Sequence, residues 1–316
     1  MILTVTMNPS IDMSYQLSHL NIGQVTRSQS VSKTAGGKGL NVARVIKLMG
    51  YEPIATGILG GHFGAFIEDK LNIEQIRHSF SHINQETRNS IALLHDQGKQ
   101  TEILESGPKI NNQESQKFLE VYKKLLKKVG LVTISGSLPP GLEKNYYAQM
   151  IDLANKQGVE VLLDSSGPYL KQGVFEKNKP YLIKPNEDEI GQLTGTSLTG
   201  ENFRQLPRYL SSGQLGKLPW IVVSLGAKGA LAKHNHNFYR AKIPKIKAIN
   251  PVGSGDSTLA GLAIGISKNE NDENILKTGM TTGILNTLEK KTGCVNRKLF
   301  KTYFSQVKIE KIEVSV

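Results

Sequence analysis

The sequence has almost no cysteine and no long hydrophobic run. Cys294 is the only cysteine in 316 residues, so the chain can form neither an internal disulfide nor a cysteine-based zinc site. We therefore expect a reducing cytoplasm as its compartment. No apolar run reaches the roughly 18 residues of a membrane span. The start of the chain, MILTVTMNPS, lacks the basic region and cleavage site of a signal peptide, so we expect no membrane partner.

Aromatic residues are also scarce, at 6% of the chain, whereas basic residues are abundant. The 39 lysines and arginines outnumber the 27 acidic residues, which gives a formal net charge of +12. Such a charge suits a polyanion or a small phosphorylated ligand. The sequence has no zinc-finger spacing and no aromatic RNA-binding signature, so we expect no nucleic-acid partner. A nucleic-acid-binding protein is the alternative, and it predicts steeply salt-dependent binding.

Short apolar, β-rich runs alternate with helical patterns along the chain. This alternation predicts an α/β fold with a mostly parallel sheet covered on both faces. The chain can bury a substantial core and has no long linker or internal repeat, so we expect one domain over residues 1–316. We expect strands within residues 2–8, 131–136, 159–166, 181–186 and 220–226.

Two segments break this alternation. Residues 12–34 alternate polar and apolar side chains around a turn at 21–23, and residues 87–104 do so around a turn at 96–98. Alternation around a turn predicts an antiparallel hairpin. Because open α/β sheets bind ligands beyond their strand ends, we interpret the two hairpins as a lid.

A glycine-rich turn, NPVGSGDST, occupies residues 250–258 between a β-like run at 243–249 and a helical run at 258–266. Free N–H groups and the dipole of the following helix attract an anion to such a turn. Asp256 would repel that anion, so the same residues also fit a tight turn with an aspartate N-cap. The local pattern leaves both interpretations open.

A second glycine-rich turn begins TAGGKGLNVARVIKLMG at residues 34–50 and runs into a helix. Its glycines let the backbone approach a ligand closely, and the helix N-terminus with Lys38 favours a phosphate or sugar hydroxyls. The turn is not a Walker A loop, because Gly39 follows Lys38 where that motif has Ser or Thr.

Two more clusters follow predicted strands. In IKPNEDE, residues 183–189, Lys184 could pair with a phosphate and Glu189 could hold Mg²⁺, although a strand followed by an acidic helix N-cap has the same pattern. SLGAKG, residues 224–229, has small residues whose backbone could lie against phosphates, as do many ordinary turns. Arg88, in ETRNS, could clamp a phosphate or be a surface arginine.

Together these motifs resemble the ribokinase-like sugar kinases of the PfkB family over nearly the whole chain. The matching motifs are, in order, MNPSID, AGGKGLNVAR, SGSLPPG, KPNEDE, VSLGAKGA and NPVGSGDS. The resemblance implies a three-layer αβα fold with a small β-hairpin lid, a sugar phosphate substrate, and ATP and Mg²⁺ as cofactors. Family members often pair their lids between subunits, which implies a homodimer.

Within the family the motifs are most similar to those of bacterial tagatose-6-phosphate kinases and then to those of 1-phosphofructokinases. The resemblance therefore implies ATP-dependent phosphorylation of D-tagatose 6-phosphate to the 1,6-bisphosphate, in the tagatose 6-phosphate pathway of lactose and galactose catabolism. Phosphorylation of fructose 1-phosphate is the alternative. A non-catalytic sugar-phosphate sensor is an alternative of another class.

The same resemblance assigns roles to individual residues. Asp256 would be the general base that takes the proton from the sugar hydroxyl. The anion hole would comprise Gly253, Ser254 and Gly255. The sugar phosphate would be bound by Asp12, Arg27, Gly36, Gly37, Lys38, Asn41, Arg88 and Ser137. The nucleotide would contact Lys184, Asn186, Ser224, Gly226, Gly229, Thr282 and Asn286. Glu189 would help to position Mg²⁺.

The sequence departs from the family pattern at the start of the glycine-rich turn at residues 250–258. Many ribokinase-like enzymes have an Asp-Thr pair there that supports a monovalent cation site, and the corresponding pair in this chain is Asn250-Pro251. The loss of that carboxylate weakens the expectation of potassium activation. Ser254, where alanine is common, is a tolerated variation.

Overall fold

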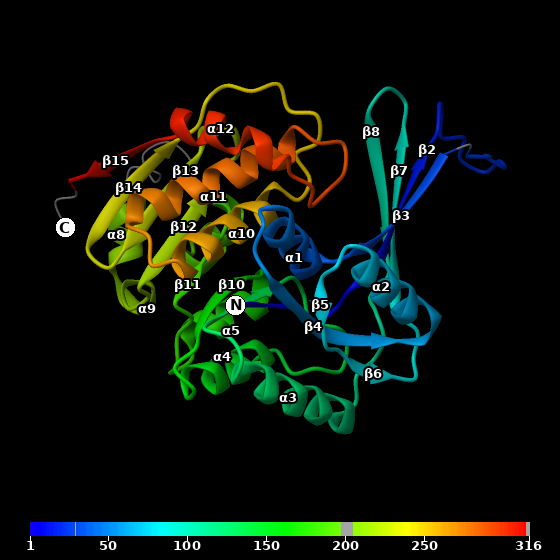
Figure 1. Ribbon diagram of the computed structural model, residues 1–316, viewed down its shortest axis with the longest axis horizontal. Helices are drawn as coiled ribbons and strands as arrows, with labels where there is room; N and C mark the ends of the chain where they lie inside the picture. Colours follow the sequence, from blue (N-terminus) through cyan, green and yellow to red (C-terminus); the bar gives the residue numbers. More distant parts are fainter. Residues whose placement is uncertain (29, 197–204, 314–316) are drawn as a thin grey trace.

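The fold is built on one large sheet and one small sheet (Figure 1). The computed structural model describes residues 1–28, 30–196 and 205–313. Gln29 of the predicted lid and the other remaining residues of the predicted domain lie outside the described residues.

The large sheet is parallel in its middle and antiparallel at one edge. Its strand order is β15-β14-β13-β12-β11-β10-β9-β1-β4-β5, and β6 also pairs with β4. The pairs from β12 to β5 are parallel, and those from β12 to β15 are antiparallel. The strands are β1 (Ile2–Thr6), β4 (Pro53–Gly60), β5 (Arg77–His78), β6 (Ser81–Ile83), β9 (Leu131–Ser135), β10 (Glu160–Asp164), β11 (Leu182–Ile183), β12 (Trp220–Ser224), β13 (Ala230–His234), β14 (Asn237–Lys242) and β15 (Lys308–Ile312).

Helices cover both faces of this sheet, which confirms the predicted α/β fold. On one face α1, α10 and α11 bury Val42, Leu259 and Leu276 against the strands, and on the other face α3 and α4 bury Phe118 and Met150. The helices are α1 (Lys38–Leu48), α2 (Gly61–Ile73), α3 (Asn112–Leu126), α4 (Tyr146–Asn155), α5 (Gly167–Phe175), α6 (Glu187–Thr194), α8 (Leu206–Ser211), α9 (Gly213–Gly216), η1 (Gly226–Lys228), α10 (Ser254–Ser267), α11 (Asp272–Thr287), η2 (Arg297–Leu299) and α12 (Phe300–Gln306).

The helix α3 shows how the sequence specifies such an element. Its first turn is a capping box, in which the Asn111 side chain accepts from the backbone of Glu114 and the Glu114 carboxylate accepts from the backbone of Asn111. Phe118, Tyr122 and Leu125 follow at helical spacing and are buried. The polar face between them is left to solvent.

The two predicted hairpins form one sheet. The strands β2 (Ser10–Gln16) and β3 (Ser30–Gly36) pair antiparallel, as do β7 (Arg88–His95) and β8 (Lys99–Leu104). In addition, β2 pairs in parallel with β7, so the order is β3-β2-β7-β8. This small sheet, which we call the lid, projects from the body (Figure 1).

Some predicted boundaries were wrong. The run at 243–249 is not a strand: β14 ends at Lys242, and Pro244 has no backbone N–H to donate to a sheet. The helix predicted over 258–266 begins earlier, at Ser254. The predicted strands 159–166 and 181–186 end sooner, at Asp164 and Ile183, because the polar residues that follow leave the sheet.

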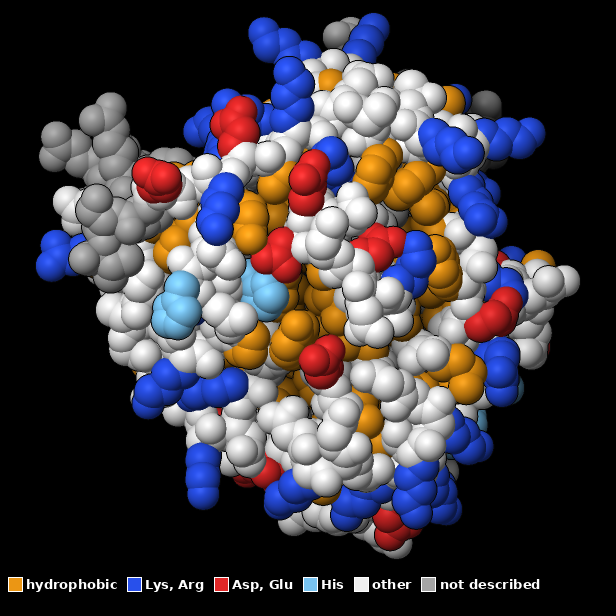
Figure 2. All heavy atoms as spheres, turned by 60° about the vertical axis from the view of Figure 1, so that its left-hand side comes forward, with side chains coloured by type: hydrophobic (Ala, Val, Ile, Leu, Met, Phe, Trp, Pro, Cys, Tyr) orange, Lys and Arg blue, Asp and Glu red, His pale blue; other side chains and the backbone are white. Residues whose placement is uncertain are grey.

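The surface has no single basic patch on the face drawn in Figure 2, where lysine and arginine side chains are spread around the periphery. Among the described helices, none combines the length and the apolar character that crossing a bilayer requires.

Candidate active site

A polar cavity lies at the carboxyl edge of the large sheet. β1 lies between β9 and β4, so later strands of the chain lie on both sides of it. Open α/β sheets bind ligands at such a point. The cavity has a volume of about 190 Å³. Its lining residues are Thr6, Asn8, Gly37, Lys38, Arg88, Ser135, Gly136, Ser137 and Ser166.

Two helices begin at this edge, and each follows a glycine in a left-handed conformation. Gly37 (φ 106°) precedes α1, and Gly253 (φ 81°) precedes α10. The two helices pack against each other. Within the described part of the chain, no acceptor meets the backbone N–H of Gly255 or Asp256. The α10 turn therefore presents free donors of the kind that bind anions.

Asp256 lies in the first turn of α10 and is 7% exposed. Its Oδ2 accepts a hydrogen bond of 2.9 Å from Nδ2 of Asn41. Burial, and then the neighbouring Asp164, raises the pKa of Asp256 to about 6, although Lys38 and Lys184 oppose this rise. A carboxylate with a pKa close to neutrality can accept a proton from a hydroxyl during a reaction.

Two lysines and a second carboxylate surround Asp256. Nζ of Lys184 lies 3.4 Å from Oδ2 of Asp164, and Lys184 is 4% exposed. The same Nζ lies 3.3 Å from the position that a Cβ on Gly255 would take. The charge of Asp164 raises the pKa of Lys38, so that lysine stays protonated despite its burial. The side chains of Lys38 and Lys184 thus lie in the site together with the free N–H groups.

Sequence reasoning missed Asp164, Thr6, Asn8, Ser135 and Ser166. A usable signal existed for Asp164, because it is the acidic residue that ends an otherwise apolar run, VEVLLD. Polar residues at the carboxyl ends of parallel strands meet at one edge of the sheet.

The residues predicted to bind the sugar phosphate are mostly together. Gly37, Lys38, Arg88 and Ser137 line the cavity. Nε of Arg88 is fixed by the backbone oxygen of Asn8 at 3.2 Å. Arg88 therefore extends from the lid to the body at the cavity.

Asp12 and Gly36 lie next to this group. A Cβ on Gly36 would overlap the Asp12 carboxylate, so only glycine fits there. Oγ of Ser10 donates to Oδ1 of Asp12 at 2.7 Å, and burial raises the pKa of Asp12. Asn41 joins the group through Asp256.

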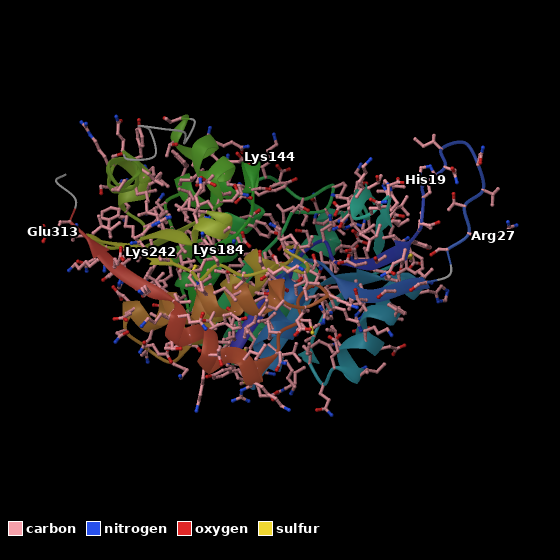
Figure 3. The ribbon with its side chains drawn as sticks, turned by 90° about the horizontal axis from the view of Figure 1, so that it is seen from above. His19, Arg27, Lys144, Lys184, Lys242 and Glu313 are labelled. Atoms are coloured by element: carbon pink, nitrogen blue, oxygen red, sulfur yellow. The ribbon has the colours of Figure 1, made fainter. Side chains whose placement is uncertain are left out.

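The structure does not bring Arg27 to the cavity within one chain. Arg27 is exposed on the loop between β2 and β3. It lies at the outer end of the lid, whereas Lys184 lies inside the body (Figure 3). The expectation that Arg27 and Arg88 clamp one phosphate together is therefore not met by a single chain.

Several residues predicted to contact the nucleotide lie on two adjacent loops. Asn186 and Ser224 form a parallel β-bridge, and the backbone N–H of Ser224 donates to Pro185 O at 2.9 Å. Gly226 (φ 55°) and Gly229 (φ 87°) flank the η1 turn that follows. The two loops together form a continuous edge beside Lys184.

Asn186 and Glu189 form a capping box at the start of α6. The Asn186 side chain accepts from the backbone of Glu189 at 2.8 Å, and Oε2 of Glu189 accepts from the backbone of Asn186 at 2.9 Å. The segment IKPNEDE therefore forms the capped start of a helix with an acidic first turn, which was the alternative interpretation of this segment. Glu189 is still close enough to Lys38 to contribute to raising its pKa.

The donor set tests whether Mg²⁺ fits here. Oε1 of Glu189 takes no part in the capping box. Across residues 1–28, 30–196 and 205–313, no group of three or more His, Cys, Asp or Glu side chains could hold a metal ion. Mg²⁺ is usually held by one or two carboxylates together with water and substrate phosphates. Glu189 as a single carboxylate beside bound phosphates is compatible with this mode of Mg²⁺ binding.

Thr282 and Asn286 lie inside the helix packing. Both are fully buried, and Oγ1 of Thr282 donates to the backbone of its own helix. Nδ2 of Asn286 donates to Val252 O and its Oδ1 accepts from Gly293 N, both at 2.8 Å. Contrary to the expected adenine contact, neither side chain reaches a surface, and Asn286 instead fastens the α10 turn.

Asn250, at the departure from the family pattern, fastens the same turn. Its Nδ2 donates to Lys290 O at 3.1 Å, and its Oδ1 accepts from Val252 N at 3.0 Å. A neutral amide therefore binds a backbone carbonyl at the place where the family pattern has a carboxylate.

Comparison with known proteins agrees with this geometry. Residues 5–298 match the sequence profile described as pfkB family carbohydrate kinase. The fold is that of the ribokinase-like kinases. The chain belongs to the PfkB family of carbohydrate kinases and is therefore a phosphotransferase.

Solved structures similar to this one include several phosphofructokinases. Phosphofructokinase-2 from Escherichia coli, in complex with potassium, is 27% identical with a TM-score of 0.88 and coverage of 96% of this chain and 98% of that chain. A Staphylococcus aureus protein provisionally named a phosphofructokinase is 30% identical, with a TM-score of 0.84 and coverage of 99% of each chain. A Thermotoga maritima protein named as a possible 1-phosphofructokinase is 24% identical, with a TM-score of 0.87 and coverage of 99% of each chain. The last similarity supports the fold alone.

Proposed function

We propose that the protein transfers the γ-phosphoryl group of ATP to the 1-hydroxyl of D-tagatose 6-phosphate, giving D-tagatose 1,6-bisphosphate. Membership of the PfkB family supports the reaction class. The order of the glycine-rich motifs, which is most similar to that of tagatose-6-phosphate kinases, supports the choice of substrate. A structure of Escherichia coli phosphofructokinase-2 that is 26% identical to this chain holds fructose 6-phosphate, which makes that sugar a competing substrate. Fructose 1-phosphate is the alternative that the resemblance of the motifs implies.

The observation that carries this proposal is the environment of Asp256. A buried carboxylate with a pKa of about 6 lies in the first turn of a helix, with Lys184 beside the same turn. The N–H groups of Gly255 and Asp256 in that turn have no acceptor among the described residues. A general base works best when its pKa is near the working pH. Free N–H groups at a helix start stabilise negative charge that builds up on a transferring phosphoryl group.

The proposed step moves one proton and one phosphoryl group. Asp256 takes the proton from the sugar hydroxyl, and the hydroxyl oxygen forms a bond to the γ-phosphorus as the bond from that phosphorus to the ADP oxygen breaks. The free N–H group of Gly255 would face the oxygens of the group in transit. The N–H group of Ser254, which was predicted to share this role, instead donates to Pro251 O at 3.2 Å. ADP leaves with the electron pair of the broken bond.

The nucleotide would lie along the edge formed by the Asn186 and Ser224 loops, with Lys184 at its phosphates. Glu189 would hold Mg²⁺ through its free carboxylate oxygen and water. When bound, Mg²⁺ neutralises charge on the phosphate oxygens.

Arg88 would bind the phosphate already on the sugar. It lies on the lid at the mouth of the cavity, and its guanidinium suits a phosphate. Arg88→Met should raise the KM for the sugar phosphate about 10- to 100-fold, as expected for loss of charged hydrogen bonds, and leave the KM for ATP unchanged. Arg77→Met, which removes an exposed arginine on β5, is the matched control.

A substrate panel tests the proposal. We would compare kcat/KM with ATP for D-tagatose 6-phosphate, D-fructose 6-phosphate and D-fructose 1-phosphate. We expect the highest value for tagatose 6-phosphate. A clear preference for fructose 1-phosphate would replace this function with that of a 1-phosphofructokinase, and no turnover of any ketose phosphate would favour a sensor.

We further propose that two copies pair through their lids. Exposed apolar side chains on the lid and its loop support this pairing; they are Ile22, Val25, Val31, Ile103 and Leu104. Pairing would also give Arg27 a ligand site to reach, in the cavity of the second copy. Ile103→Lys should convert a dimer to a monomer in light scattering, and an unchanged mass of a dimer would place the interface elsewhere.

A further inference from the structure

The amide of Asn41 has a fixed orientation beside Asp256. Its Nδ2 donates to Oδ2 of Asp256 at 2.9 Å, and its Oδ1 accepts from a terminal nitrogen of Arg44 at 3.1 Å. An amide can be turned over, which exchanges its donor and acceptor ends. A guanidinium only donates, so Arg44 holds the carbonyl end and leaves the NH₂ end for the carboxylate.

Arg44 is itself held from three directions. Its Nε lies 2.9 Å and 3.0 Å from the two carboxylate oxygens of Glu74, which directly follows α2. Its second terminal nitrogen donates to Ala35 O, in β3, at 2.6 Å. The Arg44 side chain is 11% exposed. Contacts from β3, α1 and the end of α2 therefore fix this guanidinium.

We propose that Arg44 is a positioning residue for phosphoryl transfer, which acts by fixing the Asn41 amide with its NH₂ group towards Asp256. The proposal rests on the role of Asp256 proposed above. Arg44 does not line the cavity, so its effect would pass through Asn41.

The orientation matters because the two amide ends favour opposite states of the acid. An NH₂ group stabilises the carboxylate, whereas a carbonyl oxygen stabilises the protonated acid. Lys38 of α1, Lys184 after β11 and Asp164 at the end of β10 also face Asp256. These three groups stay in place when Arg44 is replaced.

A double-mutant cycle tests the proposal. The variants are Arg44→Met, Asn41→Ala and the double variant, each assayed with ATP and the ketose phosphate that turns over fastest. We expect Arg44→Met to lower kcat about 10- to 100-fold, as loss of an orienting partner does at other sites, with the KM for ATP unchanged. In the Asn41→Ala background the same replacement should have almost no effect, because its target is gone.

The pH profile and matched controls separate positioning from folding. Arg44→Met should move the acid limb of kcat/KM to higher pH, because an amide that turns over favours protonated Asp256. Lys47 lies on the same helix as Arg44 and pairs with Glu52 beyond the end of that helix, and Lys47→Met should leave the limb unchanged. If Arg44→Met does not fold, Arg44→Lys can be used instead. It keeps the positive charge but loses the planar set of guanidinium donors, so it should shift the acid limb in the same direction by a smaller amount.

Two results would overturn the proposal: an equal loss from Arg44→Met in both backgrounds, or an unmoved acid limb in every folded Arg44 variant. The base itself is tested separately. If Asp256→Asn is fully active, the proposed function fails, whereas an inactive Asp256→Asn combined with an additive cycle removes only the role of Arg44.

Discussion

The two glycine-rich turns each place a glycine of positive φ before a helix, and they carry opposite charges. Gly37 and Gly253 both have positive φ and each precedes a helix that packs on the same face of the large sheet. The first turn of α1 begins with Lys38, whereas the first turn of α10 contains Asp256. A helix N-terminus ordinarily favours an acidic side chain and disfavours a basic one. The α10 turn therefore follows this preference with Asp256, whereas the α1 turn departs from it with Lys38.

The difference suits the two turns to different parts of the proposed reaction. Lys38 adds its charge to a helix end that is already positive, so the α1 turn suits a bound anion. Asp256, the proposed base, lies beside free N–H groups, so the α10 turn suits a hydroxyl and a phosphoryl group at once. The two turns meet through Asn41, which comes from α1 and contacts Asp256.

The largest effect should come from removing the charge of the α10 turn. Asp256→Asn keeps the size of the side chain but cannot accept the proton, so we expect kcat to fall by about 10² to 10⁴. Calorimetry should show both ligands still binding. Near-normal turnover of Asp256→Asn would show that Asp256 is not the base, and the proposed difference in function between the two turns would then be wrong.

The next effect should come from removing the charge of the α1 turn. Lys38→Met leaves the turn backbone intact, and we expect kcat/KM to fall about 10²-fold, as for other groups that stabilise developing charge. Lys47→Met on the same helix controls for the loss of a lysine. Equal effects from Lys38→Met and Lys47→Met would show that the cation at the turn has no special role.

A smaller effect should come from changing the backbone of the α10 turn. A Cβ at Gly253 would lie 2.5 Å from Cγ2 of Thr292, and its φ is positive. We expect Gly253→Ala to cost roughly 1–3 kcal/mol, seen as lower stability and lower kcat. Gly158→Ala is the control, because Gly158 also has positive φ but a Cβ added there would have no atom of the described residues within 4 Å, its own chain neighbours aside. If both variants lose stability but neither loses activity, the turn geometry is not needed for catalysis.

The smallest effect should come from monovalent cations. Asn250 already satisfies Lys290 O with a neutral donor, so potassium should change kcat no more than sodium at equal ionic strength. Asn250→Asp would place a carboxylate against that carbonyl, and we expect this variant to become stimulated by potassium, measured by titration at constant ionic strength. Potassium activation of the unchanged protein would contradict this account.

Much of the site could be predicted because it depends on local patterns. The buried strands, the two glycine turns and the helices after them are each encoded within a few neighbouring residues. The local patterns left the roles of Arg88, Lys184 and Asp256 open, and the family resemblance then assigned them. The structure brings Lys38 and Lys184 next to Asp256, and Lys38 and Arg88 line one cavity.

The rest depends on contacts between distant residues. The parallel pairing of β2 with β7, which makes one lid sheet from two hairpins, joins segments with no shared local signal. The resemblance implied a nucleotide contact for Asn286, but its partners Val252 and Gly293 lie in other segments. The role of Arg44 likewise depends on Glu74, which follows a different helix.

The pH dependence of kcat/KM, measured for the unchanged protein and for Asp256→Asn, tests the central claim most directly. Asp256 can accept a proton only when its side chain is ionised. The value of kcat/KM should therefore fall as the pH drops below the pKa of Asp256, about 6, by close to tenfold for each further pH unit. This acid limb should be absent from the residual activity of Asp256→Asn. An acid limb of the same position in both proteins would contradict the account, because the titrating group would then lie elsewhere.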